Sequence, residues 1–153
     1  MVIATEELSR ASLSIGGSLI TRPEILARAI ENGGTDNQKQ RLLPLIASGE
    51  YMPAVAVTEP DFGSDVAGIS TNARRLPDGD WEINGVKTWC TFAGRADLLM
   101  VLARTNPDIS VGHRGLSIFV VEKDRAEGHS FSFRQDHGGK LEGRAISTLG
   151  YRG

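Results

Sequence analysis

The sequence of 153 residues has only one cysteine, Cys90, and no long apolar run. A single cysteine cannot form an internal disulfide, which fits a reducing compartment. The 17 basic and 19 acidic residues nearly balance, and the resulting formal charge of -2 argues against a nucleic-acid surface or a polybasic membrane anchor. The apolar runs are broken before they could span a bilayer, and the first residues lack the pattern of a signal peptide. We therefore expect a soluble, cytoplasmic protein that binds neither nucleic acid nor membrane.

Several catalytic and metal-binding motifs are also missing. The sequence contains no G-x-S-x-G elbow, no G-x-G-x-x-G fingerprint and no Walker loop. The histidines, His113, His129 and His137, are far apart and show no zinc spacing. No histidine lies near Cys90 in the sequence to suggest an activated thiolate. These absences predict no metal site, and they identify no catalytic residue.

The first fifty residues have apolar side chains at helical spacing, which predicts three helices. The second helix can begin at Pro23, a favoured first helical position, and end at Gly33-Gly34. Thr35 lies three residues before Gln38, so a capping box is expected at the start of the third helix.

The remaining residues read as short strands separated by turns. The clearest turn signals are Leu76-Pro77-Asp78-Gly79-Asp80 and Asn84-Gly85. The stretch 106–114 is predicted to be a polar loop, and the stretch 125–144 is charged and Gly-rich with few apolar anchors. We expect an α+β fold, with helices in residues 1–52 and a small antiparallel β-barrel or sandwich in residues 53–153. The predicted strands run from Ala54 to Thr58, Ser70 to Leu76, Trp81 to Asn84, Val86 to Phe92, Leu98 to Arg104 and Leu116 to Glu122.

The stretch VAVTEPDFGSD places a loop rich in turn-forming residues directly after a predicted strand. Glu59-Pro60 ends the strand, because Pro60 has no amide donor and restricts the residue before it. The residues that follow leave backbone N–H groups free to receive a phosphate, a carbonyl or a ring edge. A plain turn explains the same residues equally well. A calcium loop does not, since the oxygen-bearing side chains lack the twelve-residue spacing.

The stretch KTWCTFAG follows the Asn84-Gly85 turn. On a strand, Trp89 and Thr91 would share one face and Cys90 would take the other. An indole beside a hydroxyl suits a planar heteroaromatic ligand. The alternative is that Trp89 belongs to the core and Thr91 is a good strand former.

An ordered series of segments resembles the acyl-CoA dehydrogenase family over nearly the whole chain. The most specific elements are T-E-P-x-x-G-S-D and N-G-x-K-x-W-x-T, which are typical of that family's middle domain. The resemblance implies the end of an N-terminal helical domain and most of a middle β-domain, without the C-terminal helical bundle. The matching segments are TEELSRASLSIGGSL, GGTDNQKQRLLPLIASGE, AVTEPDFGSDVAG, DWEINGVKTWCTFAGRAD, LLMVLART, RGLSIFVVEK and LGYRG.

The resemblance also implies a binding site for FAD. Thr58 would meet the pyrimidine end of the flavin, Trp89 would pack on the ring, and Thr91 would reach the N5 edge. Donors placed there would stabilise the negative charge that hydride transfer builds on the flavin. Ser64 would lie between the flavin phosphate and the thioester substrate. The residues that carry over as cofactor-binding are Val55, Val57, Thr58, Gly63, Ser64, Trp89, Cys90 and Thr91.

The activity implied by the resemblance is α,β-dehydrogenation of an acyl-CoA thioester. A glutamate base of the C-terminal domain takes the α-proton in that family, so this chain would carry no catalytic residue and would not turn over substrate by itself. Glu59 corresponds to the glutamate of the flavin loop and not to the base. The family implies an electron-transferring flavoprotein as partner and a homodimer or homotetramer.

A narrower similarity is to methylsuccinyl-CoA dehydrogenases, which convert (2S)-methylsuccinyl-CoA, a branched dicarboxylic thioester, to mesaconyl-CoA. In the family, the segment around Arg22 borders the acyl pocket, so Arg22 could pair with the free carboxylate of the substrate. A solvated arginine ahead of a helix is the alternative. Phe62 and Cys90 depart from the family's usual small and aliphatic residues. Two other functions stay open: a stand-alone flavin or CoA binding module, and a flavin-dependent monooxygenase of the same fold.

Overall fold

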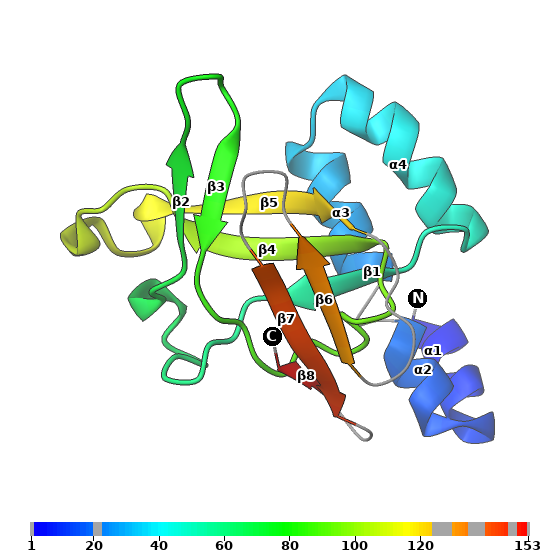
Figure 1. Ribbon diagram of the computed structural model, residues 1–153. Helices are drawn as coiled ribbons and strands as arrows, with labels where there is room; N and C mark the ends of the chain where they lie inside the picture. Colours follow the sequence, from blue (N-terminus) through cyan, green and yellow to red (C-terminus); the bar gives the residue numbers. More distant parts are fainter. Residues whose placement is uncertain (1, 20–22, 124–129, 135–139, 147–149, 153) are drawn as a thin grey trace.

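The computed structural model describes residues 2–19, 23–123, 130–134, 140–146 and 150–152 (Figure 1). The chain begins with four helices, where the sequence predicted three. They are α1 (Val2–Ala11), α2 (Leu13–Leu19), α3 (Ile25–Gly33) and α4 (Asp36–Ser48). Helices α1 and α2 pack closely, since a Cβ atom at Gly16 would lie 1.9 Å from the Ser9 hydroxyl.

The capping box predicted at Thr35 is confirmed at the start of α4. The Thr35 hydroxyl accepts a hydrogen bond from the Gln38 backbone N–H at 3.2 Å, and the Gln38 side chain accepts one from the Thr35 N–H at 2.9 Å. The helix ends at Gly49, whose φ of 78° is readily adopted by glycine. Helix α4 therefore has both of its ends fixed by local sequence.

A five-stranded sheet follows the helices. Its strands are β1 (Pro53–Ala56), β2 (Asn72–Arg75), β3 (Trp81–Asn84), β4 (Leu98–Arg104) and β5 (Leu116–Glu122). Strand β4 is central: β5 pairs with it antiparallel along its whole length, so β1 and β2 share its other edge. Strand β3 forms a hairpin with β2 through the predicted turn at Pro77-Asp78-Gly79.

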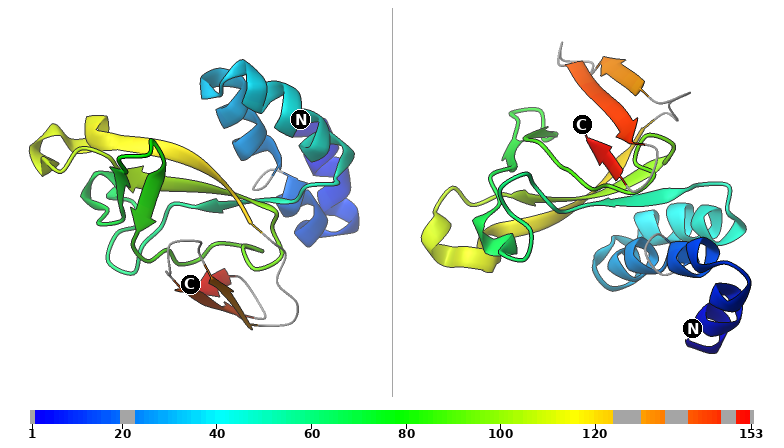
Figure 2. Two further views of the ribbon diagram at one scale, coloured as in Figure 1. Left: turned by 45° about the horizontal axis from the view of Figure 1, so that its top comes forward. Right: turned by 90° about the horizontal axis from the view of Figure 1, so that it is seen from below.

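A second, three-stranded antiparallel sheet consists of β6 (Ser130–Arg134), β7 (Lys140–Ile146) and β8 (Gly150–Arg152). Figure 2 shows this sheet and the helices on opposite sides of the five-stranded sheet. An apolar layer lies between helices α3 and α4 and the five-stranded sheet. Its buried residues are Leu26, Ile30, Leu42, Ile46, Leu98 and Met100. The bidentate pair of Arg41 with Glu122 joins α4 to β5 at the edge of this layer, with distances of 2.8 and 2.6 Å.

The order of helices followed by a β domain is confirmed, with three corrections in detail. The five-stranded sheet is mixed, because β1 and β2 both run parallel to β4. The predicted strand from Val86 to Phe92 does not form: residues 85–90 are irregular and residues 91–95 form a turn. The predicted strands end at Glu122, whereas β6, β7 and β8 lie beyond it.

No helix among the described residues is long and apolar enough to cross a membrane. In the same part of the chain, no cluster of histidine, cysteine or acidic side chains could hold a metal ion.

Candidate functional site

The site lies where β1 ends and β2 begins along one edge of β4. Strand β1 pairs with residues 98–101 of β4, and β2 rejoins the same edge only at the Asn72–Arg104 pair. Residues 57–71 therefore leave the sheet at the end of β1, and the chain rejoins the same edge of β4 at the start of β2. This segment, which we call the 57–71 loop, contains the TEPDFGSD motif.

Glu59 anchors the first part of the 57–71 loop. Its carboxylate is buried, with 3 % of the residue exposed, and accepts four hydrogen bonds. One oxygen accepts from the backbone N–H and the hydroxyl of Ser70, both at 2.7 Å. The other accepts from the Thr71 N–H at 2.8 Å and from Lys87 Nζ at 2.9 Å. The carboxylate thus links the start of the 57–71 loop to its end and to Lys87.

The pKa of Glu59 follows from these contacts. Burial by itself raises the pKa of this carboxyl, but the hydrogen bonds from Thr71, Ser70 and Lys87 outweigh it and lower the pKa to about 2. Glu59 is therefore ionised at neutral pH, and both of its oxygens are occupied. A carboxylate in this state is a poor proton acceptor.

Arg104 holds the last part of the loop. Its guanidinium is buried at the end of β4 and donates to the backbone carbonyls of Ala67 and Ile69. The Phe62 ring lies close against Gly68, where a Cβ atom would be 2.5 Å from it. Between the anchored ends, Gly63 and Ser64 are exposed. The loop therefore presents its tip to solvent from a fixed base.

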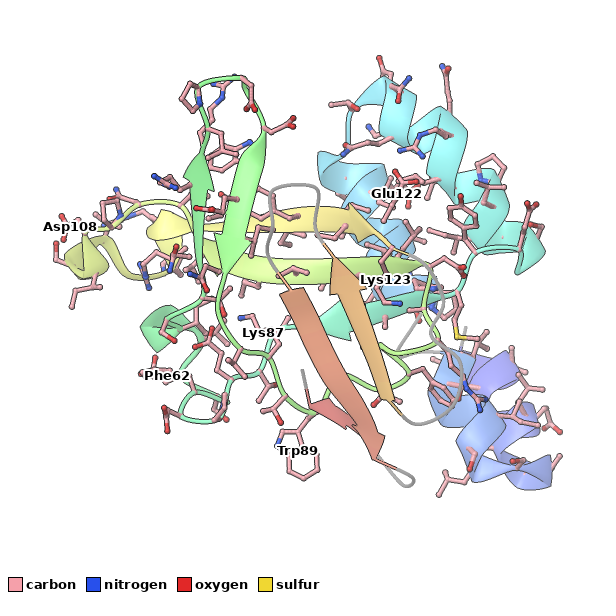
Figure 3. The ribbon with its side chains drawn as sticks, viewed as in Figure 1. Phe62, Lys87, Trp89, Asp108, Glu122 and Lys123 are labelled. Atoms are coloured by element: carbon pink, nitrogen blue, oxygen red, sulfur yellow. The ribbon has the colours of Figure 1, made fainter. Side chains whose placement is uncertain are left out.

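The second segment of the site comprises residues 85–96. Trp89 and Phe92 have φ values of 57° and 62°, and side chains other than glycine rarely adopt this left-handed conformation. Between them, Cys90 is buried against Ala54, Ala56, Ala93, Ala96 and Val101. Trp89 remains 64 % exposed, and Figure 3 shows its ring projecting away from the sheet. Strained backbone that directs an aromatic ring outward is typical of a ligand site.

Hydrogen bonds fix both ends of this segment, which we call the Trp89 segment. At its start, the Thr88 N–H donates to the Thr58 carbonyl at 2.9 Å. At its end, Lys123 Nζ donates to the carbonyls of Ala96 at 2.6 Å and Gly94 at 3.3 Å. The Trp89 segment is thereby tied to the 57–71 loop on one side and to the end of β5 on the other.

The structure brings some of the predicted site residues together and separates others. Thr58 adjoins the Trp89 segment through the Thr88 hydrogen bond. Val55 and Val57 pack against the helix-facing apolar layer, whereas Cys90 is buried on the other side of β1. Any contact that Cys90 makes with a ligand would therefore involve its backbone. Thr91 lies partly buried beside it. Arg22 lies outside the described residues.

Two domain families match this chain. Residues 1–50 match the N-terminal domain of acyl-CoA dehydrogenases, and residues 54–148 match their middle domain. The chain belongs to the acyl-CoA dehydrogenase family. Members of this family depend on FAD. The resemblance inferred from the sequence motifs is confirmed.

Individual acyl-CoA dehydrogenases show the same relationship. The chain is 44% identical to (2S)-methylsuccinyl-CoA dehydrogenase of Cereibacter sphaeroides, a match that covers 100% of this chain and 27% of that protein. A glutaryl-CoA dehydrogenase structure in complex with glutaryl-CoA is 31% identical, with a TM-score of 0.75 over 98% of this chain and 36% of that one. A glutaryl-CoA dehydrogenase of Mycobacterium smegmatis in complex with FADH2 is 30% identical, with a TM-score of 0.70 over 85% of this chain and 32% of that one. The chain therefore spans about a third or less of these relatives.

The residues of this acyl-CoA dehydrogenase chain fit a flavin. The exposed indole of Trp89 offers a flat apolar surface, and the exposed loop tip at Gly63 and Ser64 offers polar groups. Sequence reasoning found these residues but missed Lys87, Arg104 and Lys123, which hold the two segments in place. Lys87 lies within the recognised N-G-x-K-x-W-x-T motif, yet nothing in a single sequence pairs it with Glu59, 28 residues earlier.

Proposed function

We propose that this chain supplies the flavin-contacting segments of an FAD-dependent acyl-CoA dehydrogenase. The observation that carries the proposal is the exposed, backbone-strained Trp89, tied directly to the 57–71 loop. When bound, FAD would accept the hydride that leaves the β-carbon of the thioester.

Within this proposal, each predicted site residue has a role in binding or orientation. Trp89 would pack on the flavin ring, and Thr58 and Thr91 would hydrogen-bond to it. Ser64 would contribute to binding of the phosphate and the thioester. Gly63, Val55, Val57 and Cys90 would supply the remaining contacts expected from the family. In this proposal none of these residues is the base that takes the α-proton, and the buried Glu59 carboxylate of the same loop has both oxygens occupied by hydrogen bonds.

We further propose (2S)-methylsuccinyl-CoA as substrate, with mesaconyl-CoA as product. The support is the 44% identity to a methylsuccinyl-CoA dehydrogenase along the whole chain. Arg22 would then pair with the substrate's free carboxylate, since a planar guanidinium suits a bidentate contact. Electron transfer to an electron-transferring flavoprotein and a homodimeric or homotetrameric assembly belong to the same proposal.

The test uses the intact protein that contains this chain. FAD is titrated into the apoprotein, and the holoenzyme is then mixed with methylsuccinyl-CoA without oxygen while the flavin absorption is followed. Bleaching of the bound flavin is expected. An apoprotein that binds no FAD would refute the proposal. Bound flavin that no acyl-CoA bleaches would favour a binding module, and rapid reaction of the reduced flavin with oxygen to hydroxylate a substrate would favour a monooxygenase.

The Arg22 assignment has its own test in the same holoenzyme. Arg22→Ala should raise the KM for methylsuccinyl-CoA and leave the KM for a monocarboxylic acyl-CoA of similar length unchanged. The matched control is Arg28→Ala, because Arg28 pairs with Glu24 on the surface of the neighbouring helix. Equal effects of Arg22→Ala on both substrates would refute the assignment.

A further inference from the structure

The side chain of Lys87 connects the Trp89 segment to the 57–71 loop. It is only 10% exposed, and that of its partner Glu59 is 2% exposed. Lys87 Nζ donates to Glu59 and also to the backbone carbonyl of Val57, both at 2.9 Å. Figure 3 shows Lys87 directed back toward the sheet, in contrast to the outward-facing Trp89.

Lys87 and the next residue, Thr88, form hydrogen bonds with three consecutive residues of the 57–71 loop. The Lys87 ammonium binds Val57 and Glu59, and the Thr88 N–H donates to the carbonyl of the residue between them, Thr58. Trp89 is the next residue after this attachment. The spacing between Thr58 and Trp89 is therefore set by contacts to residues 87 and 88, immediately before the backbone turns into its left-handed conformation.

Glu59 extends this arrangement to the far end of the loop. Its remaining hydrogen bonds go to Ser70 and Thr71, where the loop rejoins the sheet. A charged pair removed from water holds a fixed geometry only when its remaining donors and acceptors are also satisfied, and here the carboxylate is fully bonded. The pair therefore fixes three segments relative to one another: residues 57–59, 70–71 and 87–88.

We propose that Lys87 is a positioning residue for FAD, which acts through Val57 and Glu59 to set the distance between the 57–71 loop and Trp89. This inference rests on the proposed function. Lys87 touches no flavin atom in this account. Its loss would remove two of the three hydrogen bonds described above between residues 87–88 and 57–59, so the spacing of the two segments would be less well fixed. The flavin would then have to order them on binding, and affinity would fall.

The test measures FAD binding by the intact protein, in apo form, at a temperature where every variant is fully folded. Lys87→Met removes the ammonium and keeps most of the side-chain volume. The dissociation constant of FAD should rise at least about tenfold, since hydrogen bonds to charged groups are among the stronger ones. The visible difference spectrum of the bound flavin should also change, because the ring would meet Trp89 differently.

The matched control is Leu42→Ala, which opens a cavity in the helix-facing apolar layer away from the site. This variant should lose stability but keep the parent's FAD affinity and flavin spectrum. A purely structural role for Lys87 would make Lys87→Met behave like this control, and that result would overturn the inference. The parent's own titration separates the two proposals, because a parent that binds no FAD refutes the proposed function and this inference with it.

A second variant keeps the inference testable if Lys87→Met does not fold. Lys87→Arg retains the charge and its donors but places a larger planar group between Val57 and Glu59. The inference expects weaker FAD binding and an altered flavin spectrum. Affinity and spectrum equal to those of the parent would overturn it.

Discussion

The buried Glu59 carboxylate should make the stability of this protein depend on acid pH, and Glu59→Gln should remove the contribution of Glu59 to that dependence. The pKa of Glu59 is lowered from its ordinary value of 4.5 to about 2, because the hydrogen bonds from Thr71, Ser70 and Lys87 outweigh the effect of burial. A lowering of this size corresponds to about 3 kcal/mol of stability at neutral pH. Removing one partner of a buried ion pair costs a similar amount, roughly 3–5 kcal/mol.

The sign of the Glu59 pKa shift determines how the stability changes with pH. Because the pKa is lower in the folded state, the stabilisation is fully present above the ordinary value of 4.5 and is lost as the pH falls through about 2. Parent and Glu59→Gln should therefore differ in free energy of unfolding by about 3 kcal/mol at pH 7. This difference should shrink as the pH falls from about 5 to 2.

The assay is urea denaturation of the intact protein and its variants between pH 7 and pH 2. The control is Glu82→Gln, because Glu82 and Arg74 form an exposed pair whose loss should cost below about 1 kcal/mol. A stability difference between parent and Glu59→Gln that stays constant over the whole range would refute the reasoning. It would mean that the variant loses packing or hydrogen-bond geometry rather than a charge.

Two further predictions concern other parts of the site. Gly68→Ala should weaken FAD binding and lower the melting temperature, because the added Cβ would lie 2.5 Å from the Phe62 ring. Adding Phe62→Leu to this variant should recover part of both losses. Unchanged FAD affinity in Gly68→Ala would contradict the prediction. Burial raises the pKa of the Cys90 thiol to about 11, despite the opposing charge of Lys87, so Cys90 should resist a thiol reagent at pH 8 in the native protein and react only on unfolding. Fast labelling of native Cys90 would show that its packing opens readily.

Local signals in the sequence determined much of the fold. The Thr35–Gln38 capping box depends only on residues three apart, so the sequence alone located the start of α4. The apolar runs predicted strands at Leu98–Arg104 and Leu116–Glu122, and these are the bounds of β4 and β5. The family-specific motifs around Ser64 and Trp89 predicted the two segments of the proposed site.

Tertiary structure decided what those local signals could not. Residues 86–92 are rich in β-branched and aromatic side chains and were predicted to form a strand. In the structure Trp89 has left-handed backbone, between the buried Cys90 and a segment that Lys87 joins to the 57–71 loop. The parallel pairing of β1 with β4 depends on residues more than forty positions apart in sequence. The hydrogen bonds from Arg104 to the carbonyls of Ala67 and Ile69 likewise join residues that are far apart in sequence. The sequence thus determined which residues meet the flavin in our proposal, whereas long-range hydrogen bonds between buried charges and backbone groups decided how those residues are held.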